Sequence, residues 1–387
     1  MMEHIEEKHR SDVERVKVGI THGDMNGIGY EIIIKTFHDQ RMLENITPVV
    51  YGSSKVASYH RKSLNISELN FNLVKNASAA IHKRMNIVNV THEEVKIDLG
   101  KSTEIAGQLA FKALEAAVQD LTQKHIDVLV TAPINKKNMQ SADFKFPGHS
   151  EYLSDKAGGK EHLMLMVCDK LRVGVITGHI PLKDVPSTIT TELILKKIEM
   201  MNRSLVIDFG IRKPKIAVLG LNPHAGDQGV IGMEDQQVIV PAVEQAWNKN
   251  MIVYGPYSAD GFFGSNNYLK FDGILAMYHD QGMIPFKTLA FDKGVNFTAG
   301  LPFIRTSPAH GTAYDIAGKN EASHISFREA VYLAIDIFHN RKAHEELNSN
   351  VLQNYLKDIE HSTDAVIEKE IPGATEDESP ANLIAGQ

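Results

Sequence analysis

Three histidines stand directly after apolar runs of this chain. They are His179 in VGVITGHIPL, His224 in IAVLGLNPHAG and His279 in GILAMYHDQG. Each run is typical of a buried β-strand, and each histidine is expected in the short loop that follows. The carboxyl ends of parallel strands meet at one edge of an open sheet, where ligands bind. Three neutral imidazoles with an open coordination position are typical of a catalytic divalent-metal site.

A single histidine at the end of a strand is usually a hydrogen-bonded loop residue, so this prediction depends on all three occurring together. Asp280 follows His279 directly and could orient an imidazole through its second ring nitrogen. The pattern therefore predicts a metal site without naming a reaction.

A second group of residues is suited to binding an anion. His149 and Ser150 follow a Pro-Gly turn in FPGHSEYLS, ahead of an amphipathic stretch. Lys287, Asn296 and Arg305 come later, in a region with many glycines and prolines. A serine at a helix start is usually an N-cap, and single cations are often surface residues. Together, these side chains suit a substrate that carries carboxylate and phosphate, which arginine binds through two parallel hydrogen bonds.

Two further segments are expected to be loops. The glycines of GDMNGIG (23–29) are spaced G-x3-G-x-G, which differs from the dinucleotide fingerprint G-x-G-x-x-G. This segment is either a tight strand-to-helix turn or a loop that closes on the site. HGTAYDIAGKNEAS (310–323) has no apolar periodicity and also reads as a loop. Lys136 and Lys137 in TAPINKKN could belong to the same sheet edge or to a solvated loop.

Short aliphatic runs alternate with longer amphipathic stretches along the body of the chain. This alternation predicts an α/β/α layered fold with a mostly parallel sheet. The strand candidates are 16–21, 46–52, 126–133, 171–178, 215–222 and 271–278, and the clearest helix candidates are 105–123, 189–206 and 326–347.

Composition excludes several classes of function. The 387 residues are 43% hydrophobic and 23% charged, as in an ordinary globular protein. Most of the net charge of −7 lies in residues 361–387, so no broad field favours nucleic acid or an anionic membrane. Cys168 is the only cysteine, which excludes an intramolecular disulfide and predicts a buried, inert thiol. The charged N-terminus does not resemble a signal peptide, and no apolar run approaches the ~20 residues of a membrane span. We expect a cytoplasmic protein.

The ordered motifs resemble a known family over about residues 16–345. THGDMNGIGYE, VTAPINK, FPGHSEYL, TGHIPL, LNPHAG, YHDQG and GVNFTAGLPFIRTSPAHGTAYDIAGK resemble the 4-hydroxythreonine-4-phosphate dehydrogenases of the vitamin B6 pathway. HGTAYDIAGK is also similar to the cofactor loop of isocitrate and isopropylmalate dehydrogenases, whose NAD site is not a Rossmann fold. The resemblance implies an isocitrate/isopropylmalate dehydrogenase-like fold of two α/β/α lobes, with the active site in the interlobe cleft. The first lobe would comprise 1–130 and 285–360 with the NAD loop, and the second 131–284 with the metal ligands and dimer interface. Residues 361–387 would be an acidic disordered tail.

The resemblance also assigns roles to individual residues, and it implies a homodimer whose metal site is shared between subunits. Lys287 would in addition transfer a proton. The metal ligands would be His179, His224 and His279; the substrate-binding residues His149, Ser150, Asp260, Lys287, Asn296 and Arg305; and the cofactor-binding residues His310, Gly311, Thr312, Ala313, Asp315, Ile316 and Gly318.

This chain departs from the family pattern at two places. Ser150 stands where the family usually has threonine, and the hydroxyl is retained. The usual GDPAGIGPE is GDMNGIGYE here, without either proline, which leaves the rigidity of this loop and the role of Asp24 open.

The implied activity is oxidation and decarboxylation of 4-phosphooxy-L-threonine to 3-amino-2-oxopropyl phosphate. It would use NAD or NADP and one divalent metal, zinc, cobalt, magnesium or manganese. An alternative on the same scaffold is a dehydrogenase of a sugar-acid phosphate such as D-threonate or D-erythronate 4-phosphate. A metal-dependent phosphoester hydrolase and a non-catalytic phosphometabolite-binding protein are alternatives of other classes. We expect no nucleic acid or membrane partner.

Overall fold

The computed structural model describes residues 15–140 and 144–349. Within these residues, twelve strands form one sheet in the order β3-β4-β2-β1-β5-β12-β11-β6-β7-β10-β8-β9. Strand β11 is antiparallel to β12 and β6, β6 is antiparallel to β7, and the remaining neighbours are parallel. The predicted α/β class with a mostly parallel sheet is confirmed.

The strands are β1 (Val16–Thr21), β2 (Ile46–Gly52), β3 (Phe71–Val74), β4 (Met85–Asn89), β5 (Val128–Thr131), β6 (Leu163–Cys168), β7 (Leu171–Thr177), β8 (Lys215–Leu219), β9 (Ile252–Tyr257), β10 (Gly273–Tyr278), β11 (Val295–Ala299) and β12 (Arg305–Pro308). The helices are α2 (Gly29–His38), α3 (Ser54–Ser63), α4 (Glu104–Thr122), α5 (Lys136–Met139), α6 (His149–Lys156), α7 (Val185–Thr188), α8 (Thr191–Ile207), α9 (Val240–Asn248), α10 (Ala259–Gly264), α11 (His279–Ala290) and α12 (Ile325–Ser349). Short helical turns are η1 (Gln40–Leu43), η2 (Ala77–Ala79), η3 (Leu182–Asp184), η4 (Pro223–Gly229), η5 (Asp235–Ile239) and η6 (Asn267–Lys270).

The six predicted strands correspond to β1, β2, β5, β7, β8 and β10, and the three predicted helices to α4, α8 and α12. The sequence did not indicate β12, whose residues RTSP include no aliphatic side chain although all four are buried. A polar strand is stable in the middle of a sheet only where its side chains find partners. Thr306 meets this condition by donating its hydroxyl to the Ala330 carbonyl at 2.7 Å.

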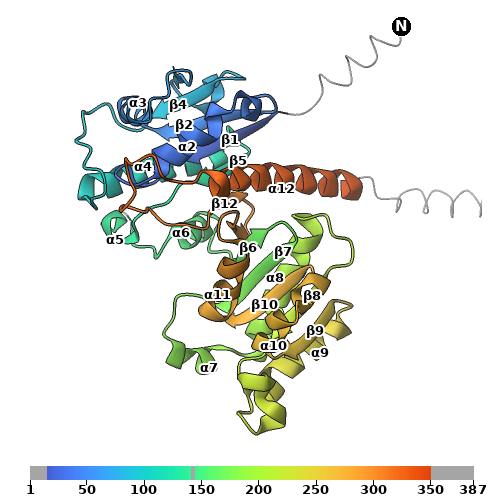
Figure 1. The fold of residues 1–387 in the computed structure, drawn as a ribbon. Coiled ribbons are helices and arrows are strands. Elements are labelled where there is room, and N and C mark those ends of the chain that lie inside the picture. The colour runs from blue at the N-terminus through green and yellow to red at the C-terminus, as the bar shows by residue number, and fades with distance from the viewer. Residues whose placement is uncertain (1–14, 141–143, 350–387) are drawn as a thin grey trace, which may run out of the picture. The chain divides into compact units, whose positions relative to one another are not determined.

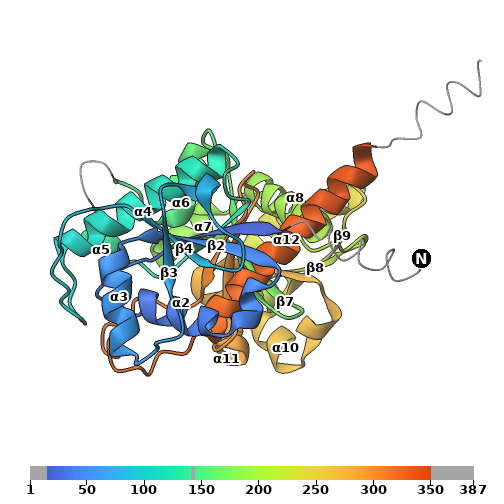
Figure 2. The same ribbon diagram turned by 90° about the horizontal axis from the view of Figure 1, so that it is seen from above.

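Alternating side chains place helices on both faces of the strands. In β2, Val50 belongs to the core cluster that contains the Ile32–Ile34 stretch of α2, whereas Val49 and Tyr51 belong to the cluster that contains most buried residues of α4. Successive strand residues point to opposite faces, so α2 and α4 cover opposite sides. Figure 2 shows these two helices on either side of β2 and β4.

The strands that carry the histidines are layered in the same way. In β10, Leu275 and Met277 pack in the cluster that contains α8, and Ile274 and Ala276 pack in the cluster that contains α11. Figure 1 shows β7, β10 and β8 as neighbours, with α11 beginning where β10 ends. This arrangement fixes the positions from which the candidate site residues project.

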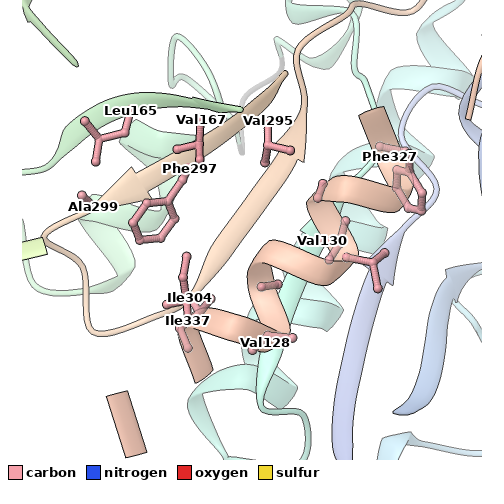
Figure 3. Packing of buried hydrophobic residues seen from close by; sticks show 14 of the residues in the cluster. Val128, Val130, Leu165, Val167, Val295, Phe297, Ala299, Ile304, Phe327 and Ile337 are labelled. Carbon is pink, nitrogen blue, oxygen red and sulfur yellow. The ribbon is translucent and has the colours of Figure 1, made fainter. Parts of the chain in front are cut away.

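Strands β11 and β12 come late in the chain but lie in the middle of the sheet, between β5 and β6. Figure 3 shows Phe327 of α12 near Val130 of β5, and Phe297 of β11 beside Leu165 and Val167 of β6. The lobe boundaries near 130 and 285 stay a prediction.

Three smaller expectations concern the rest of the chain. The predicted acidic tail, 361–387, lies outside the described residues. Cys168 is partly exposed rather than buried, although burial of its thiol still raises its pKa. Among the helices of residues 15–140 and 144–349, none is long and apolar enough to cross a membrane.

Candidate active site

His179 and His279 lie side by side at the carboxyl ends of neighbouring parallel strands. Thr177 of β7 pairs with Tyr278 of β10, and the two histidines follow these residues closely. Their ring centroids are 5.6 Å apart with an interplanar angle of 37°. The structure therefore brings these two predicted metal ligands together. His279 is the first residue of α11 and not part of a loop, because the helix begins directly where the strand ends.

The two rings are suited to binding a metal ion. His279 donates from Nδ1 to Oδ1 of Asp280 at 2.7 Å, so Nε2 of a neutral His279 carries a free lone pair. Burial lowers the pKa of His179, and the charges of Lys136 and His279 lower it further. Both effects favour a neutral imidazole at His179, the form in which histidine binds zinc and related divalent ions.

His224 does not join the pair within one chain. Strand β8 neighbours β10, but residues 224–228 all have positive φ angles between 42° and 78°, and this left-handed turn redirects the loop. The pKa of Asp260 is lowered mainly by a hydrogen bond from Ser258 and more weakly by the charge of His224, which places these two predicted residues near each other. In the described part of the chain, no three His, Cys, Asp or Glu side chains form a metal-binding group. The prediction of a site shared between subunits is untested.

The left-handed turn is held by a buried carboxylate that the sequence did not reveal. Asp235 is fully buried and accepts hydrogen bonds from the backbone N–H groups of Leu221 and Asn222, at 2.8 and 3.1 Å, and from the Asn222 side chain at 3.0 Å. Left-handed non-glycine residues cost free energy and persist where their surroundings enforce them. A rigid scaffold therefore presents His224.

A cavity of about 370 Å³ lies beside His179 and collects most of the predicted substrate-binding residues. The predicted residues that line it are His149, Ser150, His179, Asn296 and Arg305. Further lining residues with ionisable side chains, to which the sequence gave no substrate role, are Lys136, Glu151, His162 and Lys197.

Arg305 is a buried cation without a carboxylate partner. Its Nε and Nη2 donate to the Thr131 hydroxyl at 3.0 and 2.7 Å, and Nη2 also donates to Nδ1 of His149 at 3.0 Å. Burial lowers its pKa to about 10, so it remains charged near neutral pH. It has no Asp or Glu within ion-pair distance among residues 15–140 and 144–349. The charge of Glu151, in the same cavity but beyond ion-pair distance, compensates it only in part. Because a partly compensated buried charge is costly, this arrangement is suited to an anionic ligand.

The protonation state of His149 makes this residue a second hydrogen-bond donor for an anion. The guanidinium group can only donate, so Nδ1 of His149 is the acceptor and the ring proton of the neutral form resides on Nε2. Nε2 is buried and has no hydrogen-bond partner in the structure. Burial, followed by the charges of Arg305 and Lys136, holds the pKa of His149 well below its usual value. A neutral ring therefore offers one N–H donor to a ligand in the cavity.

Hydroxyl and amide side chains lie near the hydrogen-bond donors of Arg305 and His149. The Ser150 hydroxyl lies 3.1 Å from the Thr298 hydroxyl, and the buried Oδ1 of Asn296 has no partner. Ser150 is the second residue of α6 and Gly148 is its N-cap, so the hydroxyl is not used for capping. The sequence did not single out Thr131 or Thr298, although both lie at strand ends inside the motifs VTAPINK and GVNFT.

Lys287 and Asp260 do not line this cavity. Lys287 is exposed on α11, two turns after His279, and Asp260 is at the start of α10 near His224. One chain does not bring these two residues to the cavity, so their predicted roles toward the substrate stay predictions.

The predicted cofactor residues, His310 to Gly318, form a loop between β12 and α12 as expected. The loop packs on the first glycine-rich loop, where the Ile28 N–H donates to the Thr312 carbonyl at 3.1 Å. His310 has a buried Nε2 without a partner, and a side chain at Gly311 would meet no atom within 4 Å. A free ring nitrogen beside open backbone fits a nucleotide cofactor.

Comparison with known proteins identifies the family. Residues 44–334 match the model of the family described as pyridoxal phosphate biosynthetic protein PdxA. The chain belongs to the PdxA family. This confirms the resemblance seen in the motifs.

Individual relatives of the PdxA family agree with this assignment. The chain is 54% identical, over 340 residues, to a 4-hydroxythreonine-4-phosphate dehydrogenase of Bacteroides thetaiotaomicron, covering 88% of this chain and 93% of the relative. A crystal structure of the Klebsiella pneumoniae 4-hydroxythreonine-4-phosphate dehydrogenase matches with a TM-score of 0.73 at 33% identity, covering 84% and 99% of the two chains. A protein of Oceanobacillus iheyensis, provisionally named a D-threonate 4-phosphate dehydrogenase, is 36% identical over 323 residues, covering 83% of this chain and 97% of the relative.

Side-chain hydrogen bonds and ring stacking hold the first loop, which lacks the two prolines of the family pattern. Asn26 accepts a hydrogen bond from the Asp98 N–H at 2.9 Å and donates to the Lys101 carbonyl and the Thr103 hydroxyl, each at 3.0 Å. Tyr30 stacks between the rings of His22 and His60, with centroids 5.0 and 5.1 Å away. These side-chain contacts therefore constrain the loop where the two prolines of the family pattern are missing.

The buried histidines of this stack predict a loss of stability in acid. Burial lowers the pKa of His22 and of His60 to about 4 each. Between pH 6.5 and 4 the unfolded chain binds protons that the folded chain does not, so the free energy of unfolding falls as the pH falls through this range. The expected loss is at most about 3 kcal/mol per histidine.

Urea unfolding at pH 7.5 and pH 5 measures this effect. His60→Gln retains a side-chain donor that does not titrate, and it should reduce the difference between the two pH values. His38→Gln replaces an exposed histidine and is the matched control. Equal pH dependence in wild type and His60→Gln would show that this buried ring is not responsible.

Proposed function

We propose that the chain oxidises and decarboxylates 4-phosphooxy-L-threonine to 3-amino-2-oxopropyl phosphate, with NAD and a divalent metal, in vitamin B6 biosynthesis. The observation that carries the proposal is the buried, unpaired guanidinium of Arg305 beside the free N–H of His149. This pair suits the phosphate of such a substrate, and it lines the same cavity as His179. The names of the relatives from Bacteroides thetaiotaomicron and Klebsiella pneumoniae support the same substrate.

Different residues of the cavity would bind different parts of the substrate. Arg305, His149 and the Ser150 hydroxyl would hold the phosphate, and the amino end of α6 would add backbone N–H donors. His179 and His279 would hold the metal near C3. When bound, NAD would supply a hydride acceptor for C3 and a divalent cation would supply positive charge beside the C3 oxygen. The β-keto acid formed would lose carbon dioxide, and the carbon left behind would take up a proton to give the amino-ketone.

The protein would act as a homodimer in which each active site uses both subunits. His179 and His279 of one subunit would supply two metal ligands and His224 of the partner subunit the third, with Asp260, near His224, on the substrate side. Exposed apolar side chains flank these ligands: Leu182 is 67% exposed after His179, Ile284 is 64% exposed on α11, and Val230 is 81% exposed after His224. An interface between the two subunits would cover these side chains.

Several finer points belong to the same proposal. Imidazole ligands favour zinc or cobalt over magnesium or manganese. The dinucleotide would be NAD or NADP. The protein would work in the cytoplasm. Lys287 would transfer a proton near the reacting carbons, in the complete dimer.

A dehydrogenase of D-threonate or D-erythronate 4-phosphate is the second candidate. The specific observation in its favour is the relative from Oceanobacillus iheyensis. Its substrate carries a hydroxyl group in place of the amine, so the phosphate site would serve both equally.

Parallel turnover assays test the proposal. Protein, NAD and a divalent metal are mixed with 4-phosphooxy-L-threonine or with D-threonate 4-phosphate, and NADH absorbance and carbon dioxide release are followed. We expect equal amounts of NADH and carbon dioxide from the amine substrate, and a lower kcat/KM with the hydroxy acid. Preference for the hydroxy acid would favour the second candidate, and phosphate release without NADH would favour a hydrolase.

A further inference from the structure

Asp24 is a buried carboxylate at the point where the cofactor loop meets the substrate cavity. It is 1% exposed and follows β1 in the first glycine-rich loop. We propose that Asp24 and Tyr314 are positioning residues that couple cofactor binding to substrate binding, through the short helix α5. This inference rests on the proposed function, because it takes residues 310–318 as the cofactor loop.

The first link joins Asp24 to the cofactor loop. The Tyr314 hydroxyl donates to Oδ2 of Asp24 at 2.7 Å. Burial and this hydrogen bond raise the pKa of Tyr314 to about 12, so the hydroxyl keeps its proton. The loop is also held by the backbone contact from Ile28 to Thr312 and by the packing of Ala313, Ile316 and Ala317 against the core, and the tyrosine adds a side-chain hydrogen bond at its middle.

The second link joins Asp24 to the wall of the cavity. The Asn138 side-chain amide donates to the same oxygen, Oδ2, at 2.7 Å, and the Asp24 N–H donates to the Pro133 carbonyl at 2.8 Å. Asn138 belongs to α5, and the first residue of that helix, Lys136, lines the cavity with His149 and His179. A movement of Asp24 would therefore move a cavity-lining cation.

Tyr314 also lies close to the beginning of α5. Asn135 caps this helix by accepting from the N–H groups of Lys137 and Asn138, at 2.9 and 3.3 Å, and its side chain lies beside the Tyr314 hydroxyl. Oδ1 of Asp24 accepts the Asn26 N–H at 2.9 Å. The carboxylate thus has neutral donors on both oxygens, and it forms no ion pair in the part of the chain that the structure describes. Loss of one donor leaves a buried charge undersatisfied, so each link depends on the other.

Calorimetry on the metal-loaded full chain tests the coupling. NADH is used in place of NAD so that no turnover occurs, and the dissociation constant of 4-phosphooxy-L-threonine is measured with and without it. In wild type we expect NADH to tighten substrate binding by about fivefold. In Tyr314→Phe we expect NADH to bind about tenfold more weakly and the tightening of substrate binding by NADH to disappear. Asp24→Asn should weaken both ligands.

Controls separate this role from general stability. Tyr332→Phe removes the hydroxyl of an exposed tyrosine on α12 and should behave as wild type. A Tyr314→Phe variant that melts at a lower temperature but binds NADH and shows coupling like wild type would overturn the inference alone. A wild-type chain that binds no NADH would overturn the proposed function and this inference with it.

Discussion

Replacing Arg305 with methionine is expected to lower kcat/KM for the phosphorylated substrate by about 10³-fold. The guanidinium has no carboxylate partner in the described chain and lines the cavity beside the free N–H of His149. Each hydrogen bond to a charged group contributes about 1.5–3 kcal/mol, and an arginine that binds phosphate makes two, which corresponds to roughly 10²–10⁴ in affinity. The loss should appear mainly in KM, because the phosphate group itself is not changed in the reaction.

The same substitution should not destabilise the fold. A buried charge that Glu151 compensates only in part costs free energy in the empty protein, and methionine fills similar space without that cost. We expect the free energy of unfolding of Arg305→Met to equal or exceed that of wild type. Inorganic phosphate should raise the melting temperature of wild type and not that of the variant.

Arg172→Met is the matched control for this experiment. Arg172 is also partly buried, but it stacks on Phe209 at 4.5 Å and lines a different cavity, of about 400 Å³. Its replacement should leave KM for the substrate unchanged. An Arg305→Met variant that keeps the wild-type KM would show that the phosphate binds elsewhere.

Replacing His279 or His179 with alanine is expected to remove the metal and lower kcat by about 10³-fold or more, because the cation contributes several kcal/mol to stabilising charge in the transition state. Metal content of the purified protein is the direct measurement, and it should fall from one equivalent per chain to almost none.

Asp280→Asn retains the ligand but weakens its orientation through Nδ1, so metal affinity should fall by about 10–100-fold. His38→Gln, at an exposed histidine in an ion pair with Glu68, should retain full metal content.

The meeting of His179 and His279 could be predicted from the sequence because strand ends are visible in it. Two apolar runs with a histidine immediately after each one place both rings at the same sheet edge once the strands are neighbours and parallel. His224 follows an equally clear run, and β8 is also a neighbour of β10. What the sequence does not show is the left-handed turn over residues 224–228, which depends on the distant carboxylate of Asp235.

The anion site was only half predictable for a related reason. The sequence shows residue types that bind phosphate, at Arg305, His149 and Ser150, in segments that contain glycine and proline. Their arrangement depends on β12, a strand without aliphatic residues that pairs with β5 and so brings Arg305 to Thr131. The periodicity of apolar residues identifies apolar strands. It does not identify a polar strand whose side chains form long-range hydrogen bonds.

The central claim is that one metal ion is bound by His179 and His279 of one subunit and by His224 of the other. The most direct test is a heterodimer of a His224→Ala chain and a His279→Ala chain, purified through two different tags. Each parent homodimer should be inactive and without metal. In a closed twofold dimer the hybrid retains one intact site, so we predict about half of the wild-type activity and about one metal ion per dimer. A hybrid as inactive and metal-free as its parents would contradict the shared site.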